Sequence, residues 1–405
     1  MATPGPAGPR GARQSTLRAT NLGLVLRTVC GAGEPPSRAD VAVRTGMTRA
    51  TAARLVDDLV AGGLLDEADR VPQATRGRPA TPLVAGAGVV ALGLQVDAGL
   101  LAARLVDLRG RVVAERLVDG DWVGSEPGPT LTEVGRLAAA VLADVPAGTR
   151  LVGAGLALPG IVDVGRGVLL RAPNLGWRDV RPADVLAAHL PAGLDPVPGN
   201  EADLAARTVA ETAPGRPGAH RDFLYVSGQI GIGGAVVLDG RVMGGSAGWA
   251  GEVGHVCVDP DGPPCRCGST GCLERYAGRH AVLAAAGLPP GAPPGELLAR
   301  AAAGDPRALA ALGGARRALA VALAGVVNVL DVPSVVLGGW LGRLAGDARH
   351  GLADGLADEM AGRVLSARWR RPRIEVSAAD PAPAARGAAL RVLADVLDDP
   401  ARWLT

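Results

Sequence analysis

One pattern of strands and helices occurs twice along this chain of 405 residues, and it limits the folds open to the chain. In the first half, three short strands are expected at 89–96, 102–107 and 112–117, followed by a helix at 131–142 and a buried strand at 151–158. In the second half, strands are expected at 223–226, 233–238 and 335–337, with a long helix at 308–330. Consecutive strands followed by alternating helices and strands are typical of layered α/β proteins. The repeated order suggests a pair of α/β lobes, arranged as in actin, with a cleft between them. Periodicity alone supports only a mixed α/β body of the size of an enzyme.

A different pattern precedes these lobes. Apolar residues recur at helical spacing from Ser15 to the glycines at 31–33, and Ser37 is placed to cap a second helix over 38–44. A turn at Thr45-Gly46 follows, and Thr48 caps a third helix that ends at Gly62-Gly63. This is the layout of a helix-turn-helix, whose second helix enters the major groove of DNA. A plain three-helix packing unit has the same layout and remains the alternative.

The charge distribution favours the DNA-binding interpretation. Residues 1–56 carry eight arginines against two acidic residues, whereas the formal charge of the whole chain is +2. The exposed start of the third helix predicts DNA contacts from Thr48, Arg49, Thr51 and Arg54. A strand from Leu64 and the later Arg76-Gly77-Arg78-Pro79 outline a wing, from which Arg76 and Arg78 would reach into a narrow minor groove. A solvated linker is the alternative for that segment.

Composition and the helical pattern give the expected N-terminal boundaries and the compartment. We expect a disordered Pro/Gly/Arg-rich tail at 1–14 and a winged helix-turn-helix at 15–82. The chain shows no signal peptide, and uncharged stretches such as 83–96 are shorter than the ~18–20 residues of a membrane span, so a cytoplasmic protein is expected. Four of the five cysteines lie within 257–272, which in the cytoplasm indicates a metal site rather than disulfides.

Residues 251–276 read GEVGHVCVDPDGPPCRCGSTGCLERY, and here the sequence resembles the ROK family of sugar kinases and repressors. Further matching motifs are GAGLALPGIVD (153–163), APNLGW (172–177), GNEADLAARTVAE (199–211), SGQIGIGG (227–234) and VVLGG (335–339). The resemblance covers nearly the whole chain. It implies an N-terminal winged helix-turn-helix followed by an α/β actin-like (ribonuclease H-like) two-lobed ROK domain. Its first lobe would span 83–196 and its second lobe 197–385, and a last helix at 386–405 would return to the first lobe. The N-terminal extension is typical of the repressor branch, which includes xylose-type and N-acetylglucosamine-type repressors, since the free-standing kinases lack it.

The resemblance also implies a zinc module within 252–276. Its ligands would be His255, Cys265, Cys267 and Cys272, which match the family's His-x9-Cys-x-Cys-x4-Cys spacing. Three thiolates and one imidazole complete a tetrahedral shell with no open position, so the zinc would be structural rather than catalytic. Cys257 is expected to be a core residue.

The same resemblance implies a sugar site. Its hydroxyl-binding positions correspond here to Asn174, Asn200, Glu201, Glu252, His255 and Glu274. Carboxylates and amides suit a ring of hydroxyl groups because each offers several hydrogen bonds. His255 would use one ring nitrogen for zinc and the other for the sugar.

Two departures from the kinase pattern predict that phosphoryl transfer is lost. The family's Asp-x-Gly-Gly-Thr turn cradles ATP phosphates, and the corresponding residues here are Asp97-Ala98-Gly99-Leu100. The catalytic aspartate corresponds to Glu201, whose longer side chain displaces the carboxylate by about 1 Å and can cost on the order of 100-fold in rate.

The expected function is a sugar-responsive repressor of carbohydrate uptake or catabolic genes, which binds operator DNA as a homodimer or a dimer of dimers. Sugar between the lobes would release the DNA. Two alternatives remain: an ATP-dependent hexose kinase with an accessory DNA module, and a sensor whose sugar tightens DNA binding or whose signal is a partner protein.

Overall fold

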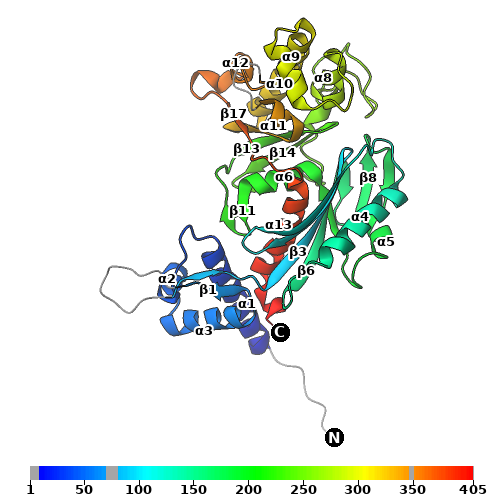
Figure 1. Ribbon diagram of the computed structural model, residues 1–405. Helices are drawn as coiled ribbons and strands as arrows, with labels where there is room; N and C mark the ends of the chain where they lie inside the picture. The colour runs from blue at the N-terminus through cyan, green and yellow to red at the C-terminus, as the bar shows by residue number, and fades with distance from the viewer. Residues whose placement is uncertain (1–8, 70–80, 346–350, 405) are drawn as a thin grey trace.

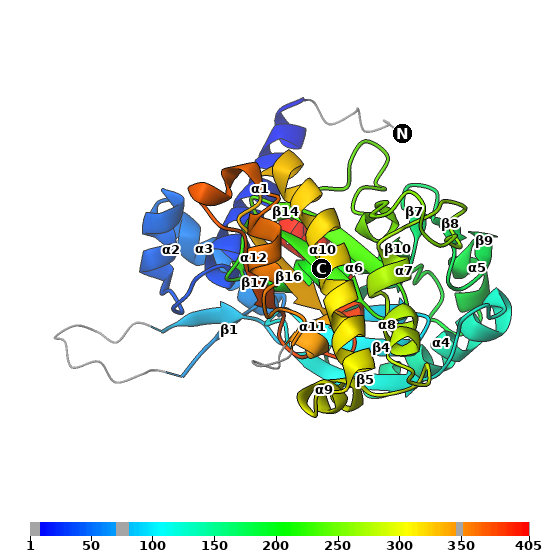
Figure 2. The ribbon, with the colours of Figure 1, turned by 90° about the horizontal axis from the view of Figure 1, so that it is seen from above.

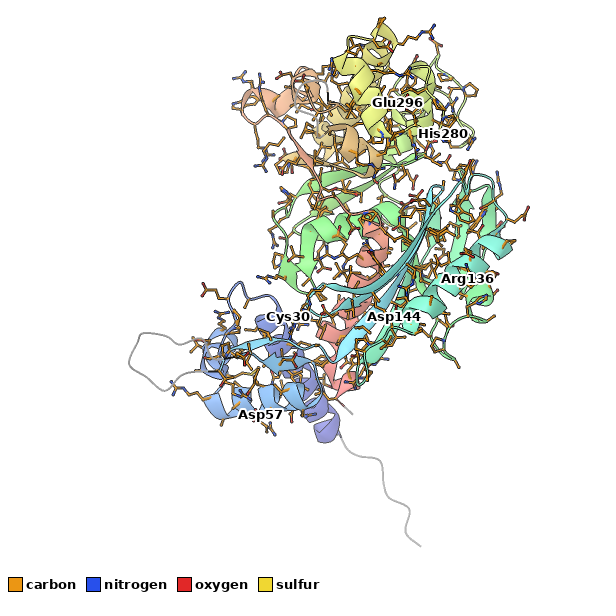
Figure 3. The ribbon with its side chains drawn as sticks, in the orientation of Figure 1. Cys30, Asp57, Arg136, Asp144, His280 and Glu296 are labelled. Atoms are coloured by element: carbon orange, nitrogen blue, oxygen red, sulfur yellow. The ribbon has the colours of Figure 1, made fainter. Side chains whose placement is uncertain are left out.

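The computed structural model describes residues 9–69, 81–345 and 351–404. It contains an N-terminal unit, two lobes and a long C-terminal helix, which runs from between the lobes to the N-terminal unit (Figure 1). Figure 3 labels a residue in each part: Asp57 in the N-terminal unit, Asp144 in the first lobe and His280 in the second lobe.

The N-terminal unit consists of three helices and a two-stranded sheet. The helices are α1 (Pro9–Cys30), α2 (Arg38–Thr45) and α3 (Arg49–Ala61), and strand β1 (Leu65–Glu67) pairs antiparallel with β2 (Leu83–Ala85). Ser37 and Asp40 form a reciprocal capping box at the start of α2, and Thr48 accepts a hydrogen bond from the Thr51 amide at the start of α3. Gly46 has φ 71°, the left-handed conformation that the turn between α2 and α3 requires.

Two expectations about this unit are corrected. The tail predicted for 1–14 is helical from Pro9 onward, because proline fits the first turn of a helix, where its missing N–H has no partner to lose; residues 1–8 lie outside the described residues. The boundary expected at 82 also moves, because β2 pairs with β1 and so belongs to the N-terminal unit.

The first lobe is built on a five-stranded sheet of order β10-β6-β3-β4-β5. Its strands are β3 (Val89–Val96), β4 (Leu100–Asp107), β5 (Val112–Asp119), β6 (Arg150–Leu158) and β10 (Val197–Asn200). Helices α4 (Pro127–Leu142) and α5 (Pro182–Leu186) and a small sheet of β7 (Ile161–Asp163), β8 (Val168–Ala172) and β9 (Trp177–Val180) complete the lobe. The second lobe therefore does not begin at 197, since β10 pairs parallel with β6. Its Val-Pro-Gly-Asn sequence carries no strand signal.

The second lobe repeats this arrangement. Its sheet has the order β15-β14-β13-β16-β17, with strands β13 (Phe223–Gly228), β14 (Ile232–Leu238), β15 (Arg241–Val242), β16 (Ser334–Gly338) and β17 (Arg373–Val376). In both sheets the first three strands pair antiparallel, and the fourth and fifth add in parallel. This repetition confirms the predicted pair of α/β lobes.

Helices cover the second sheet: α7 (Glu274–Ala277), α8 (Arg279–Ala285), α9 (Pro294–Ala302), α10 (Pro306–Leu330), α11 (Gly339–Ala345) and α12 (Leu356–Ala361), with short 3-10 turns at η1 (Val253–His255) and η2 (Leu365–Arg368). Figure 2 shows α10 running along this lobe. By length and composition α10 could cross a membrane, but 56% of its most apolar window is buried inside the protein, as in the core helix of a globular domain.

Two helices lie at the centre of the molecule. Helix α6 (Glu201–Ala210) leads to the hairpin β11 (Glu211–Ala213) and β12 (Arg216–Pro217), and α13 (Pro383–Asp398) is followed by η3 (Pro400–Trp403). Helix α13, which begins three residues earlier than expected, packs against α6, β3 and β6. The contact is close, because a Cβ atom at Gly93 would overlap the carbonyl oxygen of Ala385. The helix thus lies against the first sheet.

Candidate functional site

A polar pocket lies between the lobes, and all six residues predicted to bind sugar line it. They are Asn174, Asn200, Glu201, Glu252, His255 and Glu274, joined by Asp97, Ser227 and Gln229 among others. The pocket holds about 660 Å³ of space between atoms, counting its open mouth. The first lobe, α6 and the second lobe each contribute walls, so a bound molecule would contact both halves of the protein.

Asn174 and Glu274 meet across the pocket, although they lie in different lobes. The Asn174 amide donates to Glu274 Oε2 at 3.2 Å, and the backbone amide of Ile232 donates to the same oxygen at 3.2 Å. A Cβ atom at Gly231 would overlap the ends of both side chains, so a larger residue at this place would have to displace the pair. The pair therefore connects the lobes even without a ligand.

Asn200 and Glu201 stand at the start of α6. Asn200 caps this helix by accepting from the amides of Ala202 and Asp203, and its own amide donates to the Gly160 carbonyl at 2.9 Å. Glu201 points its carboxyl group into the pocket beside Asp97. Because the side-chain oxygen of Asn200 accepts the hydrogen bonds that cap α6, the position of this side chain in the pocket wall is fixed before any ligand binds.

Asp97 and Glu201 form a buried pair of carboxyl groups. Burial raises the pKa of both, and the charge of Asp97 raises the pKa of Glu201 further. The amide of Gln95 donates to Glu201 Oε1 at 3.3 Å, which opposes this rise in pKa. The two carboxyl groups together offer several hydrogen-bonding positions to the hydroxyl groups of a ligand.

Glu252 and His255 form the wall on the side of the second lobe. The imidazole Nε2 lies 3.9 Å from Glu252 Oε2, and burial raises the pKa of Glu252 although His255 opposes it. Behind them, burial and the charge of Glu252 raise the pKa of Asp203 to about 7. One side of the pocket thus holds several acids whose charged forms are disfavoured by burial and by one another. Hydroxyl groups of a ligand would stabilise these charged forms by donating hydrogen bonds to them.

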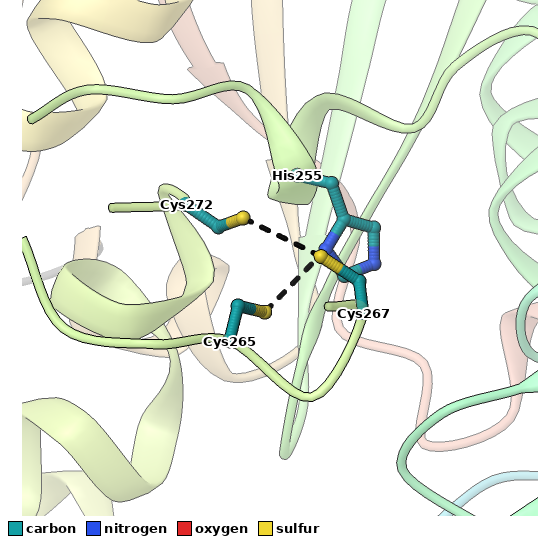
Figure 4. A group of neighbouring side chains, drawn as sticks. All are labelled: His255, Cys265, Cys267 and Cys272. Carbon is teal, nitrogen blue, oxygen red and sulfur yellow. Dashed lines mark hydrogen bonds between the residues drawn. The ribbon is translucent and has the colours of Figure 1, made fainter. Parts of the chain in front are cut away.

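The four predicted metal ligands also come together. The ligand atoms of His255, Cys265, Cys267 and Cys272 all lie within 4.8 Å of one another, and Figure 4 shows their side chains pointing toward a common centre. The Sγ atoms of Cys267 and Cys272 are 3.6 Å apart, and Cys265 Sγ lies 3.8 Å from His255 Nδ1. A tetrahedral shell with bonds of about 2.0–2.3 Å has edges of roughly 3.3–3.8 Å, so the cluster can bind a metal ion.

His255 belongs to both the cluster and the pocket. Its Nδ1 faces the sulfur atoms, whereas its Nε2 faces Glu252. Cys257 is exposed, so the expectation that it is a core residue is wrong. It lies on an isolated bridge opposite Cys272, outside the four-residue cluster.

The turn expected to replace the kinase phosphate loop is a tight hairpin between β3 and β4. The Asp97 amide donates to the Leu100 carbonyl at 2.9 Å, and the Gly99 amide donates to Asp97 Oδ1 at 3.1 Å. Asp97 is 3% exposed. The kinase turn has the same aspartate, and the departure lies in Leu100 and Leu101, which stand where the kinase turn has glycine and threonine.

On the N-terminal unit, Thr48, Arg49 and Arg54 are exposed and Thr51 is half-buried. The hydroxyls of Thr48 and Thr51 lie 2.9 Å apart within the helix cap. Within the described residues, Arg49 and Arg54 form no ion pair, whereas the acids of α3 are neutralised: Asp57 pairs with Arg38, and Asp58 with Arg18. Arg76 and Arg78 lie outside the described residues.

Sequence reasoning missed two side chains near the site, Gln95 and Asp203. Gln95 is 1% exposed on β3, lies outside the quoted motifs and contacts Glu201 from behind the pocket. Asp203 lies in the first turn of α6, inside the motif that suggested Asn200 and Glu201. Gln95 follows an apolar run as its single polar residue, a signal that a buried hydrogen-bonding role would leave.

Comparisons with known proteins agree with this geometry. The model of the ROK family matches residues 94–394. The chain is 28% identical over 270 residues to a xylose repressor of Caldicellulosiruptor bescii, covering 66% of each chain, or just under two thirds of the relative's length. It is 33% identical over 225 residues to a glucokinase of Halalkalibacterium halodurans, covering 49% of this chain and 63% of that one.

A solved structure supports the fold over nearly the whole length. It is a ROK family transcriptional regulator described as a homolog of the E. coli MLC protein, with a TM-score of 0.74 and 24% identity, and the match covers 96% of this chain and 99% of that one. The two sheets, the pocket between them and the family match lead to one conclusion: the chain belongs to the ROK family.

Proposed function

We propose that this protein is a sugar-responsive repressor, whose N-terminal unit binds operator DNA and releases it when a sugar occupies the pocket between the lobes. The observation that carries the proposal is the combination, in one chain, of a pocket lined by acids and amides and a helix that begins with exposed, unpaired arginines. The similarity to xylose repressors and to a ROK transcriptional regulator supports it.

Helices α2 and α3 with the β1–β2 hairpin would act as a winged helix-turn-helix. The start of α3 would enter the major groove and bring Thr48, Arg49, Thr51 and Arg54 to DNA, with the Thr48 and Thr51 hydroxyls also serving the helix cap. Because the acids of α3 are paired with arginines, they would repel phosphates less. Arg76 and Arg78 of the wing would reach the minor groove.

The sugar would lie among Asn174, Asn200, Glu201, Glu252, His255 and Glu274. Their oxygen and nitrogen atoms come from both lobes, so a ligand that uses them all favours one distance between the lobes. To move the protein from 1:99 to 99:1 between two arrangements, the ligand must favour one of them by about 5.5 kcal/mol. Several charge-assisted hydrogen bonds of about 1.5–3 kcal/mol each are sufficient.

A structural zinc ion held by His255, Cys265, Cys267 and Cys272 would fix this wall of the pocket. The zinc supplies a rigid cross-link and leaves no open position for catalysis. His255 would keep its second ring nitrogen for the sugar, because Nδ1 is the nitrogen that faces the thiols.

The alternative proposal is an ATP-dependent hexose kinase, which the similarity to a glucokinase supports. Glu201 stands at the position of the family's catalytic aspartate, and its longer side chain displaces the carboxylate by about 1 Å, which can cost on the order of 100-fold in rate. The turn after β3 also has Leu100 and Leu101 where the kinase turn has glycine and threonine, so part of the phosphate-binding motif is missing. We therefore favour a protein that binds sugar and has lost phosphoryl transfer.

A repressor of this type would act in the cytoplasm as a homodimer or a dimer of dimers. Its two recognition helices would enter successive major grooves, about 34–36 Å apart on a palindromic operator. Genes for carbohydrate uptake or catabolism are the expected targets.

The test is a fluorescence-anisotropy titration with promoter DNA from the protein's own gene cluster. The titration is repeated at fixed salt with a panel of monosaccharides and sugar phosphates. Release by one sugar supports the repressor. Tighter binding with a sugar would instead identify a corepressor mechanism, and sugar phosphorylation from ATP without specific DNA binding would favour the kinase.

A further inference from the structure

The C-terminal helix α13 begins without a side-chain cap of its own. Its N-cap residue is Ala382, which has no group to accept a hydrogen bond from the first turn. The amide of Ala385 instead donates to Gln95 Oε1 at 3.1 Å, a contact between residues 290 positions apart. A residue of the first sheet thus satisfies one of the free amides at this helix start.

The same side chain also reaches the pocket. Gln95 Nε2 donates to Glu201 Oε1 at 3.3 Å, and Glu201 lines the pocket. Gln95 is 1% exposed, so bulk water does not reach its carboxamide. If a sugar hydroxyl draws the Glu201 carboxyl group away, the carboxamide rotates to keep this hydrogen bond, and the rotation pulls Oε1 from the Ala385 amide in the first turn of α13.

The other end of α13 is tied to the N-terminal unit. Arg27 of α1 donates to the Leu397 carbonyl at 2.9 Å and pairs with Asp398 at 3.0 Å. Gly23 of α1 lies so close that a Cβ atom there would stand 3.0 Å from the same carbonyl oxygen. Beyond the helix, Leu404 packs against Gly62, where α3 ends.

Between its ends, α13 shares one apolar core with the N-terminal unit. Leu390, Leu393 and Leu397 are buried in the same cluster as residues of α1 and α3. A helix of 16 residues is about 24 Å long, and a helix packed along its length moves as a rigid body more easily than it bends. In Figure 1, α13 runs from the region between the lobes to α1.

We propose that Gln95 is the positioning residue that couples ligand binding at Glu201 to the N-terminal unit through α13. Resting on the function proposed above, this inference assigns the route by which the pocket controls DNA binding. Gln95 itself touches neither sugar nor DNA. It positions the start of α13, the helix that packs against α1 and the end of α3.

The test compares full-length wild-type protein with Gln95→Met, which keeps the size of the side chain and removes its amide group. Operator affinity is measured with and without a saturating concentration of the sugar that releases wild type, and the ratio of the two is the coupling factor. We expect the coupling factor to fall at least tenfold in Gln95→Met. Arg27→Gln, at the opposite end of the helix, should reduce it similarly and keeps the test valid if Gln95→Met fails to fold.

Thr130→Val is the matched control, because it removes a buried hydroxyl that donates to the carbonyl of Glu126, the residue that caps α4 in the first lobe. It should retain the wild-type coupling factor. Wild-type coupling in Gln95→Met and Arg27→Gln, or an equal loss in Thr130→Val, would overturn the inference.

Hydrogen exchange separates this inference from the proposed function. Sugar should change the exchange of amides in the first turn of α13 and in α1 in wild type, and not in Gln95→Met, even with no DNA present. A sugar-dependent change in α1 without any operator binding would refute the repressor and keep the route. Operator release by sugar with no change in α13 or α1 would refute the route and keep the repressor.

Discussion

The metal cluster offers a prediction whose size follows from its place in the chain. Cys267→Ser replaces one of the four ligand atoms with a hydroxyl, a poor ligand for zinc. An ion bound to all four side chains closes the chain between His255 and Cys272, and closing a loop of about 15 residues stabilises a folded state by about 3 kcal/mol.

We expect Cys267→Ser to lose most of this stabilisation. For a lobe of this size, 3 kcal/mol corresponds to a decrease in melting temperature of roughly 6–12 °C. Zinc content should fall from one ion per chain toward zero. Because His255 belongs to both sites, the affinity for sugar should fall as well.

The assay is metal analysis by mass spectrometry together with calorimetric melting of protein purified without chelator. Cys257→Ser is the matched control, since Cys257 is exposed and lies outside the cluster. It should keep both the zinc and the melting temperature. Full zinc content in Cys267→Ser, or equal losses in both variants, would refute the reasoning.

Three further predictions concern the pocket, its acids and the DNA-binding surface. Gly231→Ala should weaken sugar binding at least tenfold in calorimetry because its Cβ overlaps the pocket pair, whereas Gly99→Ala, with no atom within 4 Å, should not; equal affinities would contradict this. Burial raises the pKa of Asp203 to about 7 in the folded protein, so its protonated form contributes stability that is complete below about pH 4 and lost as the pH rises through 7. Asp203→Asn should therefore reduce the fall in melting temperature between about pH 5 and 8. The same dependence of melting temperature on pH in the variant and wild type would count against this prediction. Arg49→Ala should weaken operator binding about 5- to 100-fold and reduce its salt dependence, while Arg136→Ala in the first lobe should have no effect; an equal response of both would contradict the proposed interface.

Much of the site was predictable because its residues lie in short motifs with fixed spacing. Few arrangements other than a shared metal site fit the spacing of His255 and the three cysteines. The acids that line the pocket lie in the same family motifs, so the resemblance predicted them together with the metal ligands. The pair of lobes was predictable from the order of apolar segments, since strand and helix periods differ.

Other features depend on contacts that a linear pattern does not contain. The residues of β10 have low strand propensity and resemble a turn. The strand is stabilised by its pairing with β6, which the sequence of the segment does not show. Cys257 sits among cluster residues and is nevertheless exposed, and its position in the sequence does not distinguish it from the buried Cys265 and Cys272. The double role of Gln95 joins positions 95, 201 and 385, and no local spacing relates them.

The central claim is that the pocket and the DNA-binding surface are thermodynamically coupled. The most direct measurement is calorimetric titration of the releasing sugar into the protein, alone and saturated with operator DNA. Because coupling is reciprocal, the account predicts that operator weakens sugar binding by the same factor by which sugar weakens operator binding. Equal sugar affinity in the two titrations would contradict the account.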